Sequence, residues 1–201
     1  MTPVNSWLPD NQIIAILRGL PPEDAANVGK ALYQSGTRVM EVPLNRPQAL
    51  SCITILRENL PSDCIVGAGT VINITQVEQV KNAGGQLIVS PNCDSDLIDY
   101  TLELGLISLP GIATASEAFQ AYHAGATTLK VFPAASYGTD HIKALTSVLP
   151  PECALIAVGG VSIENRHQWL SAGARAVGIG SHLYQQGDNL SQIQQKIKGL
   201  V

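Results

Sequence analysis

A lysine lies inside an apolar segment of the chain, where its side chain could act as a nucleophile. Lys130 is the only charged residue in the run TLKVFP. Burying an ammonium group is costly, and burial lowers the pKa of a lysine, which leaves a free amine able to attack a carbonyl. Two structural interpretations stay open. The side chain could reach solvent from a strand end, or it could pair with Glu41 for stability alone.

Two further charged residues follow apolar runs and could serve the same reaction. Glu41, in VMEVPL, can take a proton from one species and return it to another, directly or through water. Arg18, in AILRG, carries a planar guanidinium that matches the carboxylate of a keto acid. Each has a structural alternative, because Glu41 could sit in a buried salt bridge and Arg18 could simply neutralise Glu41.

Two glycine-containing segments near the end of the chain suggest a phosphate site. AVGGV contains Val158, Gly159 and Gly160, and GIGSHL contains Gly180 and Ser181. Glycine allows backbone N–H groups to approach an anion closely. Phosphate-binding barrels present such groups after their last two strands. A phosphate is therefore expected here, although glycine pairs also serve plain turns.

Other residues after apolar runs carry weaker signals. Thr70 in GAGTV and Pro91 in SPN could shape a pocket, or could serve ordinary turn chemistry. Tyr137 and His141, in SYGTDH, could line the same opening or bind nothing. The four histidines show no HxH or HExxH spacing, so no metal site is expected. The four cysteines form no CxxC pair and are expected to be reduced thiols.

These residues must be brought together by regular elements, and eight short apolar runs predict strands that could do so. The runs are Ile13–Leu17, Arg38–Val42, Cys64–Ala68, Gln86–Val89, Leu106–Leu109, Thr128–Phe132, Ala154–Val158 and Arg175–Ile179. Runs such as IIAIL and ALIAV are apolar on both faces, which is typical of strands in a buried parallel sheet.

Amphipathic segments between the runs predict helices. Five of them end in a glycine, the residue favoured just past a helix C-terminus. These glycines are Gly36, Gly85, Gly105, Gly125 and Gly173. Capping or acidic residues mark predicted helix starts at Pro21-Pro22-Glu23-Asp24, Thr75, Asp94, Thr114 to Glu117 and Ser162 to Asn165.

Eight strand–helix units in about 200 residues fit one (β/α)8 barrel domain spanning residues 1–201. A doubly wound open sheet is the alternative. The barrel is favoured because no GxGxxG follows the first run and because polar or glycine-rich motifs follow nearly every run. In a barrel these strand ends face one mouth. The first ten residues are expected to form a cap or short arm.

Composition excludes several classes of protein. The hydrophobic content of 45% supplies a sizeable core. A net charge of −4 without clusters of Lys and Arg argues against nucleic acid and anionic membranes as partners. The start MTPVNSWLPD has neither the basic nor the apolar part of a signal peptide, and no run of 18 apolar residues occurs. The protein is expected to be soluble and cytoplasmic.

The motifs AILRG, EVPL, VGAGTV, SPN, PGIATASEA, LKVFPA, AVGGV and GIGS occur in this order. Together they resemble the aldolase family that cleaves 2-keto-3-deoxy-6-phosphogluconate and its galactonate epimer. The resemblance covers essentially the whole chain, and LKVFP with EVPL is its most diagnostic part. It implies a homotrimeric class I aldolase without a cofactor, in which Lys130 forms an imine with the 2-keto group and Glu41 moves the proton. It also implies pyruvate-end contacts from Arg18 and Thr70, with Pro91 in the substrate pocket, and a phosphate cradle of Gly159, Gly160, Gly180 and Ser181.

Two positions bear on which substrate the resemblance implies. Gluconate-type members resemble one another in an arginine four residues after the glutamate and in a Thr-Gly-Gly turn. Here these positions are Asn45 and Val158, as in the galactonate branch. The implied reaction cleaves 2-dehydro-3-deoxy-6-phosphogalactonate to pyruvate and D-glyceraldehyde 3-phosphate, a step of galactonate degradation of the Entner–Doudoroff type. Arg46 departs from this branch, which tends to have a smaller residue there, and could restore a gluconate-like contact if it bent into the mouth.

Three other functions stay open on the sequence. The protein could cleave 2-dehydro-3-deoxy-6-phosphogluconate or 4-hydroxy-2-oxoglutarate within the same family. It could be a phosphate-barrel isomerase that uses the same glycine loops without an imine. It could also be a sugar-phosphate-binding barrel without catalysis, although Lys130, Glu41 and both glycine loops argue against that.

Overall fold

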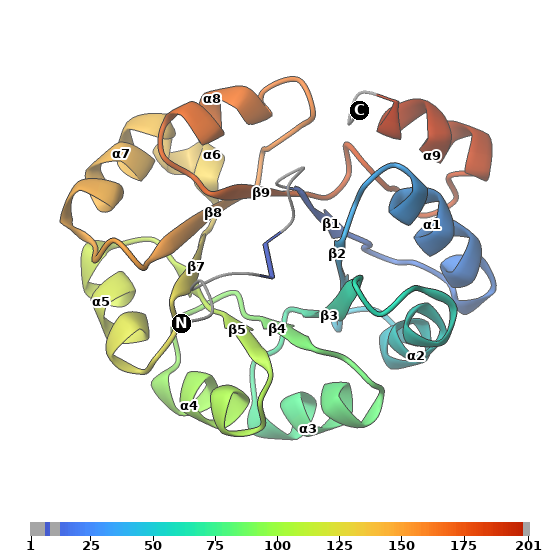
Figure 1. Ribbon diagram of the computed structural model, residues 1–201, viewed down its shortest axis with the longest axis horizontal. Helices are drawn as coiled ribbons and strands as arrows, with labels where there is room; N and C mark the ends of the chain where they lie inside the picture. The colour runs from blue at the N-terminus through green and yellow to red at the C-terminus, as the bar shows by residue number, and fades with distance from the viewer. Residues whose placement is uncertain (1–6, 9–12, 199–201) are drawn as a thin grey trace.

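Strands and helices alternate along the chain and form a nearly closed barrel, with the strands inside and the helices outside (Figure 1). The computed structural model describes residues 7–8 and 13–198. The strands are β1 (Ile13–Ile16), β2 (Val39–Pro43), β3 (Ile65–Gly69), β4 (Leu87–Val89), β5 (Ile107–Leu109), β6 (Gly111–Ile112), β7 (Thr128–Val131), β8 (Ala154–Val158) and β9 (Ala176–Ile179). The helices are α1 (Pro22–Gln34), α2 (Ala49–Asn59), α3 (Ile74–Asn82), α4 (Ser95–Glu103), α5 (Ala115–His123), α6 (Ala134–Tyr137), α7 (Thr139–Val148), α8 (Arg166–Ser171) and α9 (Leu190–Ile197).

The two edge strands of the sheet follow each other in the sequence. Its strand order is β5-β4-β3-β2-β1-β9-β8-β7-β6, and the pairs within it are parallel. The first and last strands of this order, β5 and β6, are separated only by Pro110. All eight predicted strands are confirmed to within one residue at each end. The prediction missed β6, because two residues after a proline are too few to show a periodic pattern.

The apolar residues on the two faces of each strand enter different cores. Ile13 and Ala15 belong to the outer core under the helices, whereas Ile14 and Ile16 belong to an inner core within the barrel. Side chains alternate between the faces of a strand, so this division explains why the strands are apolar on both faces. Trp7 and Leu8 pack against the inner core, and the rest of the expected arm, residues 1–6 and 9–10, lies outside the described residues.

Helix ends follow local capping chemistry. Gly36, Gly84, Gly105, Gly125 and Gly173 follow five of the helices and have a positive φ, between 73° and 109°, which any side chain would strain. The prediction of Gly85 after α3 was wrong by one residue, because Gly84 takes this conformation and Gly85 does not. Asp94 accepts a hydrogen bond from the N–H of Leu97, and Thr114 forms a capping box with Glu117. The prediction of Thr75 as a helix start was wrong. Asn73 caps α3 by accepting from the N–H of Gln76, so the helix begins before Thr75.

No helix in residues 7–8 and 13–198 is both long enough and apolar enough to cross a membrane.

Candidate active site

Strand alternation places the carboxylate of Glu41 inside the barrel. Val39, two residues earlier on β2, belongs to the inner core, so Glu41 shares its face. Glu41 is only 4% exposed, and its Oε2 atom has no hydrogen-bond partner among the described residues. Gly69 leaves room for this group, because a Cβ there would overlap the carboxylate. Burial raises the pKa of Glu41 to about 7, against the opposing effects of Lys130 and Arg18.

Lys130 also faces the barrel interior. Its neighbours on β7, Leu129 and Val131, belong to the outer core, so Lys130 points the other way. The side chain is buried, and its Nζ atom lies 4.5 Å from the centre of the Phe132 ring. Burial lowers the pKa of Lys130, Arg18 lowers it further, and Glu41 opposes both effects. The interior thus holds a carboxyl and an amine whose pKa values are shifted toward each other.

Arg18 continues the inner face of β1 beyond the end of that strand. Ile14 and Ile16 belong to the inner core, and Arg18 is the next residue with the same alternation. Its side chain is exposed, yet its charge acts on both Glu41 and Lys130. Arg18 therefore stands at the boundary between the buried pair and the open mouth.

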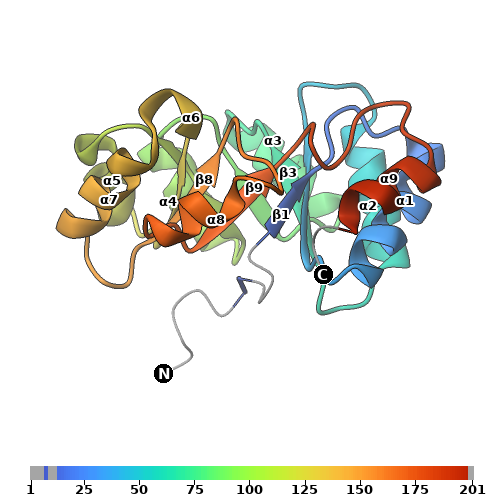
Figure 2. The same ribbon diagram turned by 90° about the horizontal axis from the view of Figure 1, so that it is seen from above.

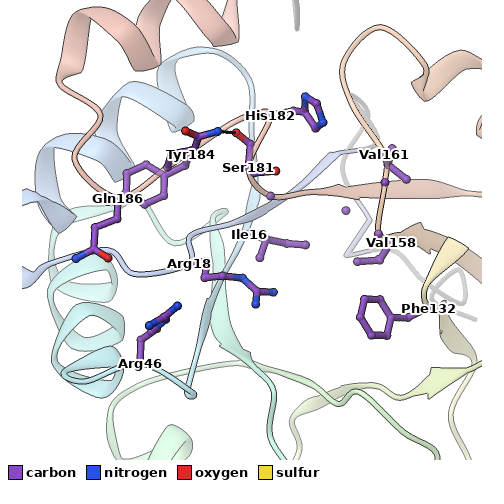
Figure 3. A pocket seen from close by; sticks show the side chains of 15 residues that line it. Ile16, Arg18, Arg46, Phe132, Val158, Val161, Ser181, His182, Tyr184 and Gln186 are labelled. Atoms are coloured by element: carbon purple, nitrogen blue, oxygen red, sulfur yellow. Dashed lines mark hydrogen bonds between the residues drawn. The ribbon is translucent and has the colours of Figure 1, made fainter. Parts of the chain in front are cut away.

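A cavity of about 400 Å³ opens at the carboxyl ends of β1, β8 and β9 (Figure 3). Its wall consists of Ile16, Arg18, Arg46, Phe132, Val158, Gly159, Gly160, Val161, Gly178, Gly180, Ser181, His182, Tyr184, Gln185 and Gln186. A cavity of this size accommodates a small-molecule ligand. Phe132 connects the cavity to the buried amine, because the ring that lines the wall also contacts Lys130 Nζ.

Backbone donors remain available in the two glycine loops that line this cavity. The N–H groups of Gly160, Ser181 and His182 donate to no other atom in the described part of the chain. Gly160 has a φ of 74°, and a Cβ there would overlap Ala135. Gly180 differs, since the nearest atom to a Cβ at this position would be 3.8 Å away. Packing among the described residues therefore leaves room for a Cβ at position 180, on the wall of the cavity.

The sequence-predicted site residues fall into three groups. Arg18, Val158, Gly159, Gly160, Gly180 and Ser181 line the cavity, and Glu41 and Lys130 lie buried in the barrel. The third group is Asn45, Thr70 and Pro91, which follow the ends of β2, β3 and β4 and lie off the wall of this cavity. Asn45 is exposed, and Thr70 is half-buried with a φ of 59°. A positive φ in a threonine is strained, and such strain is concentrated at functional sites.

Several wall residues were not predicted. Phe132 was assigned to a strand but not to a pocket, although it remains 37% exposed. Tyr184, Gln185 and Gln186 come from the loop between β9 and α9, where no motif points to a site.

Tyr137 and His141 stack on each other, and His141 Nε2 lies 2.8 Å from the carbonyl oxygen of Ala113. Among the described residues, no group of three or more histidines, cysteines or carboxylates could hold a metal ion.

Comparison with known proteins relates nearly the whole chain to one group of enzymes. The family model described as KDPG and KHG aldolase matches residues 4–198. The 2-dehydro-3-deoxy-6-phosphogalactonate aldolase of Escherichia coli (strain K12) is 42% identical over 196 residues, 97% of this chain and 95% of that protein. A structure described as native KDPGal has 41% identity and a TM-score of 0.91, covering 94% of this chain and 91% of that one. The KDPG aldolase of Legionella pneumophila, solved with pyruvate captured as a covalent carbinolamine, has 26% identity and a TM-score of 0.87, covering 100% and 97%.

Proposed function

Because the chain belongs to the KDPG and KHG aldolase family, we propose that it cleaves 2-dehydro-3-deoxy-6-phosphogalactonate to pyruvate and D-glyceraldehyde 3-phosphate through an imine on Lys130. The observation that carries this proposal is a buried amine whose pKa is lowered, beside a buried carboxyl whose pKa is raised to about 7. A neutral amine is the nucleophile that an imine requires, and a carboxyl that titrates near neutrality can both accept and return a proton.

The reaction proceeds as follows. The Lys130 amine adds to the C2 carbonyl, and the resulting carbinolamine loses water to give a protonated imine. The Glu41 carboxylate takes the proton of the C4 hydroxyl, the C3–C4 bond breaks, and its electron pair moves to the imine to give an enamine. D-glyceraldehyde 3-phosphate leaves. Glu41 returns its proton to C3 of the enamine, and water releases pyruvate from Lys130. No cofactor is needed, because the protonated imine accepts the electrons.

Two parts of the mouth hold the ends of the substrate. Arg18 and Thr70 bind the pyruvate end, and Pro91 closes that side of the pocket. The free N–H groups of the loops at Gly159 and Gly160 and at Gly180 and Ser181 cradle the phosphate. Asn45 and Val158 match the galactonate branch, and the 42% identity to an enzyme named for the galactonate substrate supports this choice.

The finer architecture is part of the same proposal. Counting β5 and β6 as one barrel strand bent at Pro110 gives eight strand–helix units, a (β/α)8 barrel in a single domain over residues 1–201. The protein acts in the cytoplasm as a homotrimer, as the family resemblance implies.

Trapping with pyruvate and borohydride tests the reaction. Wild-type protein should gain a reduced adduct on the peptide that contains Lys130. A Lys130→Met variant should gain none, and Lys143→Met, which removes an exposed lysine from α7, should react like wild type. An adduct that persists in Lys130→Met would contradict the proposed imine. The ratio of kcat/KM for the two C4 epimers then tests the substrate, and a preference for the gluconate epimer would contradict it.

A further inference from the structure

Arg46 enters the cavity from the loop between β2 and α2. It stands five residues after Glu41, beyond the end of the same strand. Figure 3 shows its side chain near Arg18 and Gln186, across the cavity from Val158 and Val161. The side chain is exposed and forms no ion pair or hydrogen bond with the described residues. Arg46 is therefore a cation on the wall of the site that has no partner among residues 7–8 and 13–198.

The charges around this cavity favour an anion. Arg18 and Arg46 both line it, and no aspartate or glutamate in the described part of the chain does so. Two guanidinium groups facing the same space repel each other unless an anion neutralises them. The proposed substrate supplies two anionic groups, a carboxylate at C1 and a phosphate at C6. The position of each arginine relative to Lys130 indicates which group it binds.

Arg18 and Arg46 differ in their effect on the reacting groups. Arg18 influences the pKa of both Glu41 and Lys130, whereas Arg46 is not among the charges that shift either one. The C1 carboxylate is bonded to C2, the atom that Lys130 attacks, so it must stay near Lys130. The phosphate is bonded at the opposite end of the chain of carbon atoms. Arg46 is exposed on the cavity wall and shifts the pKa of neither Glu41 nor Lys130, so it is placed for the phosphate rather than for the C1 carboxylate.

We propose that Arg46 is a specificity-determining residue that binds the substrate phosphate across the cavity from the glycine loops. This inference rests on the proposed function and deepens it. The glycine loops supply neutral N–H donors, and Arg46 adds a full charge with two parallel donors, the geometry that suits a phosphate. The consequence is selection for phosphorylated over unphosphorylated keto acids.

Kinetics on a matched pair of substrates test this role. The pair is 2-dehydro-3-deoxy-6-phosphogalactonate and the same sugar acid without phosphate. Arg46→Gln should lower kcat/KM about 10- to 100-fold for the phosphorylated compound, as expected for a lost hydrogen bond to a charged group. It should change the value for the unphosphorylated compound less than about twofold, since that compound lacks the Arg46 partner. Arg46→Lys, which keeps the charge, should lose less than Arg46→Gln.

Arg175→Gln is the matched control, because it removes the same charge from an exposed position just before β9, at the other end of the barrel. It should leave both substrates unaffected. Equal losses on both substrates in Arg46→Gln, or no loss on either, would overturn the proposal. A changed preference between the two C4 epimers would also overturn it, because Arg46 would then act on the C4 hydroxyl.

Binding of inorganic phosphate separates this inference from the proposed reaction. Calorimetric titration of wild type, Arg46→Gln and Arg175→Gln needs no turnover, so it remains informative even if the wild-type protein cleaves neither epimer. The Kd for phosphate should rise in Arg46→Gln alone. Equal affinity in all three proteins, or no phosphate binding by wild type, would refute the role of Arg46.

Discussion

Replacing Glu41 by glutamine should change how the free energy of unfolding depends on pH. The carboxyl has a pKa of about 7 in the folded protein against 4.5 for the model group. Glu41 therefore contributes stability that is fully present below pH 4.5 and is lost as the pH rises to about 7. At ~1.4 kcal/mol per pKa unit, the complete loss is about 3 kcal/mol, most of which falls between pH 5 and pH 8. Glutamine has no such loss, because its amide does not titrate.

Urea unfolding of wild type and Glu41→Gln at pH 5, 6, 7 and 8 measures this difference. Both proteins are held at one concentration, because association of subunits would shift the apparent stability. The free energy of unfolding of the variant relative to wild type should rise by about 2 to 3 kcal/mol from pH 5 to pH 8. The free-energy cost of burying the glutamine amide is the same at each pH, so it does not contribute to this change with pH. Glu58→Gln, at an exposed position on α2, should show no trend.

Lys130 provides an internal check on the cause. Its charge lowers the pKa of Glu41 and so opposes the effect of burial. The same comparison in a Lys130→Met background should therefore give a larger pH trend than in wild type, a coupling that a double-mutant cycle isolates. A constant difference between pH 5 and pH 8, or a trend of the opposite sign, would refute burial as the main influence on Glu41.

Two glycine-to-alanine substitutions should distinguish a glycine that leaves room for Glu41 from a glycine that leaves room for the ligand. Gly69→Ala should lower the free energy of unfolding by about 1–3 kcal/mol and kcat by at least about tenfold, because its Cβ would overlap the Glu41 carboxylate. Urea unfolding measures the first effect and steady-state kinetics the second. An unchanged kcat would contradict the overlap. Gly180→Ala should leave stability within about 0.5 kcal/mol, since its Cβ would meet no atom closer than 3.8 Å. Its KM for the phosphorylated substrate should still rise several-fold, and an unchanged KM would show that the methyl group does not enter the phosphate site.

The barrel was predictable because burial on both faces leaves a simple signature in each strand. Ile13–Ile16 and Ala154–Val158 are apolar throughout since one face meets the helices and the other fills the interior. The signature fails for Gly111–Ile112, which is too short to show it. The start of α3 could not be read from the sequence for a different reason, since both Asn73 and Thr75 have side chains suited to capping a helix. Only the backbone conformation selects Asn73, which is extended with a φ of −157°.

The site was predictable where strands position it and not where loops do. Glu41 and Lys130 lie on strands, so alternation alone sends them into the interior. Asn45 and Arg46 lie past the end of β2, where side chains no longer alternate between two faces. Of the two, only Arg46 lines the cavity. Tyr184 to Gln186 reach the wall from a loop for the same reason. Sequence reasoning therefore placed the buried pair Glu41 and Lys130 better than the loop residues of the cavity wall.

The position of Arg18 links substrate binding to the charge on Lys130. In the free protein Arg18 lowers the pKa of Lys130, which adds to the effect of burial and keeps the amine available for attack. In the proposed reaction the C1 carboxylate then pairs with Arg18 and offsets its positive charge. The same nitrogen must now carry a positive charge as the protonated imine, and it does so beside an arginine whose influence has been neutralised. Arg18 thus favours the neutral amine of Lys130 before the substrate binds. Once Arg18 is paired with the C1 carboxylate, it no longer opposes the protonated imine, which accepts the electron pair of the C3–C4 bond.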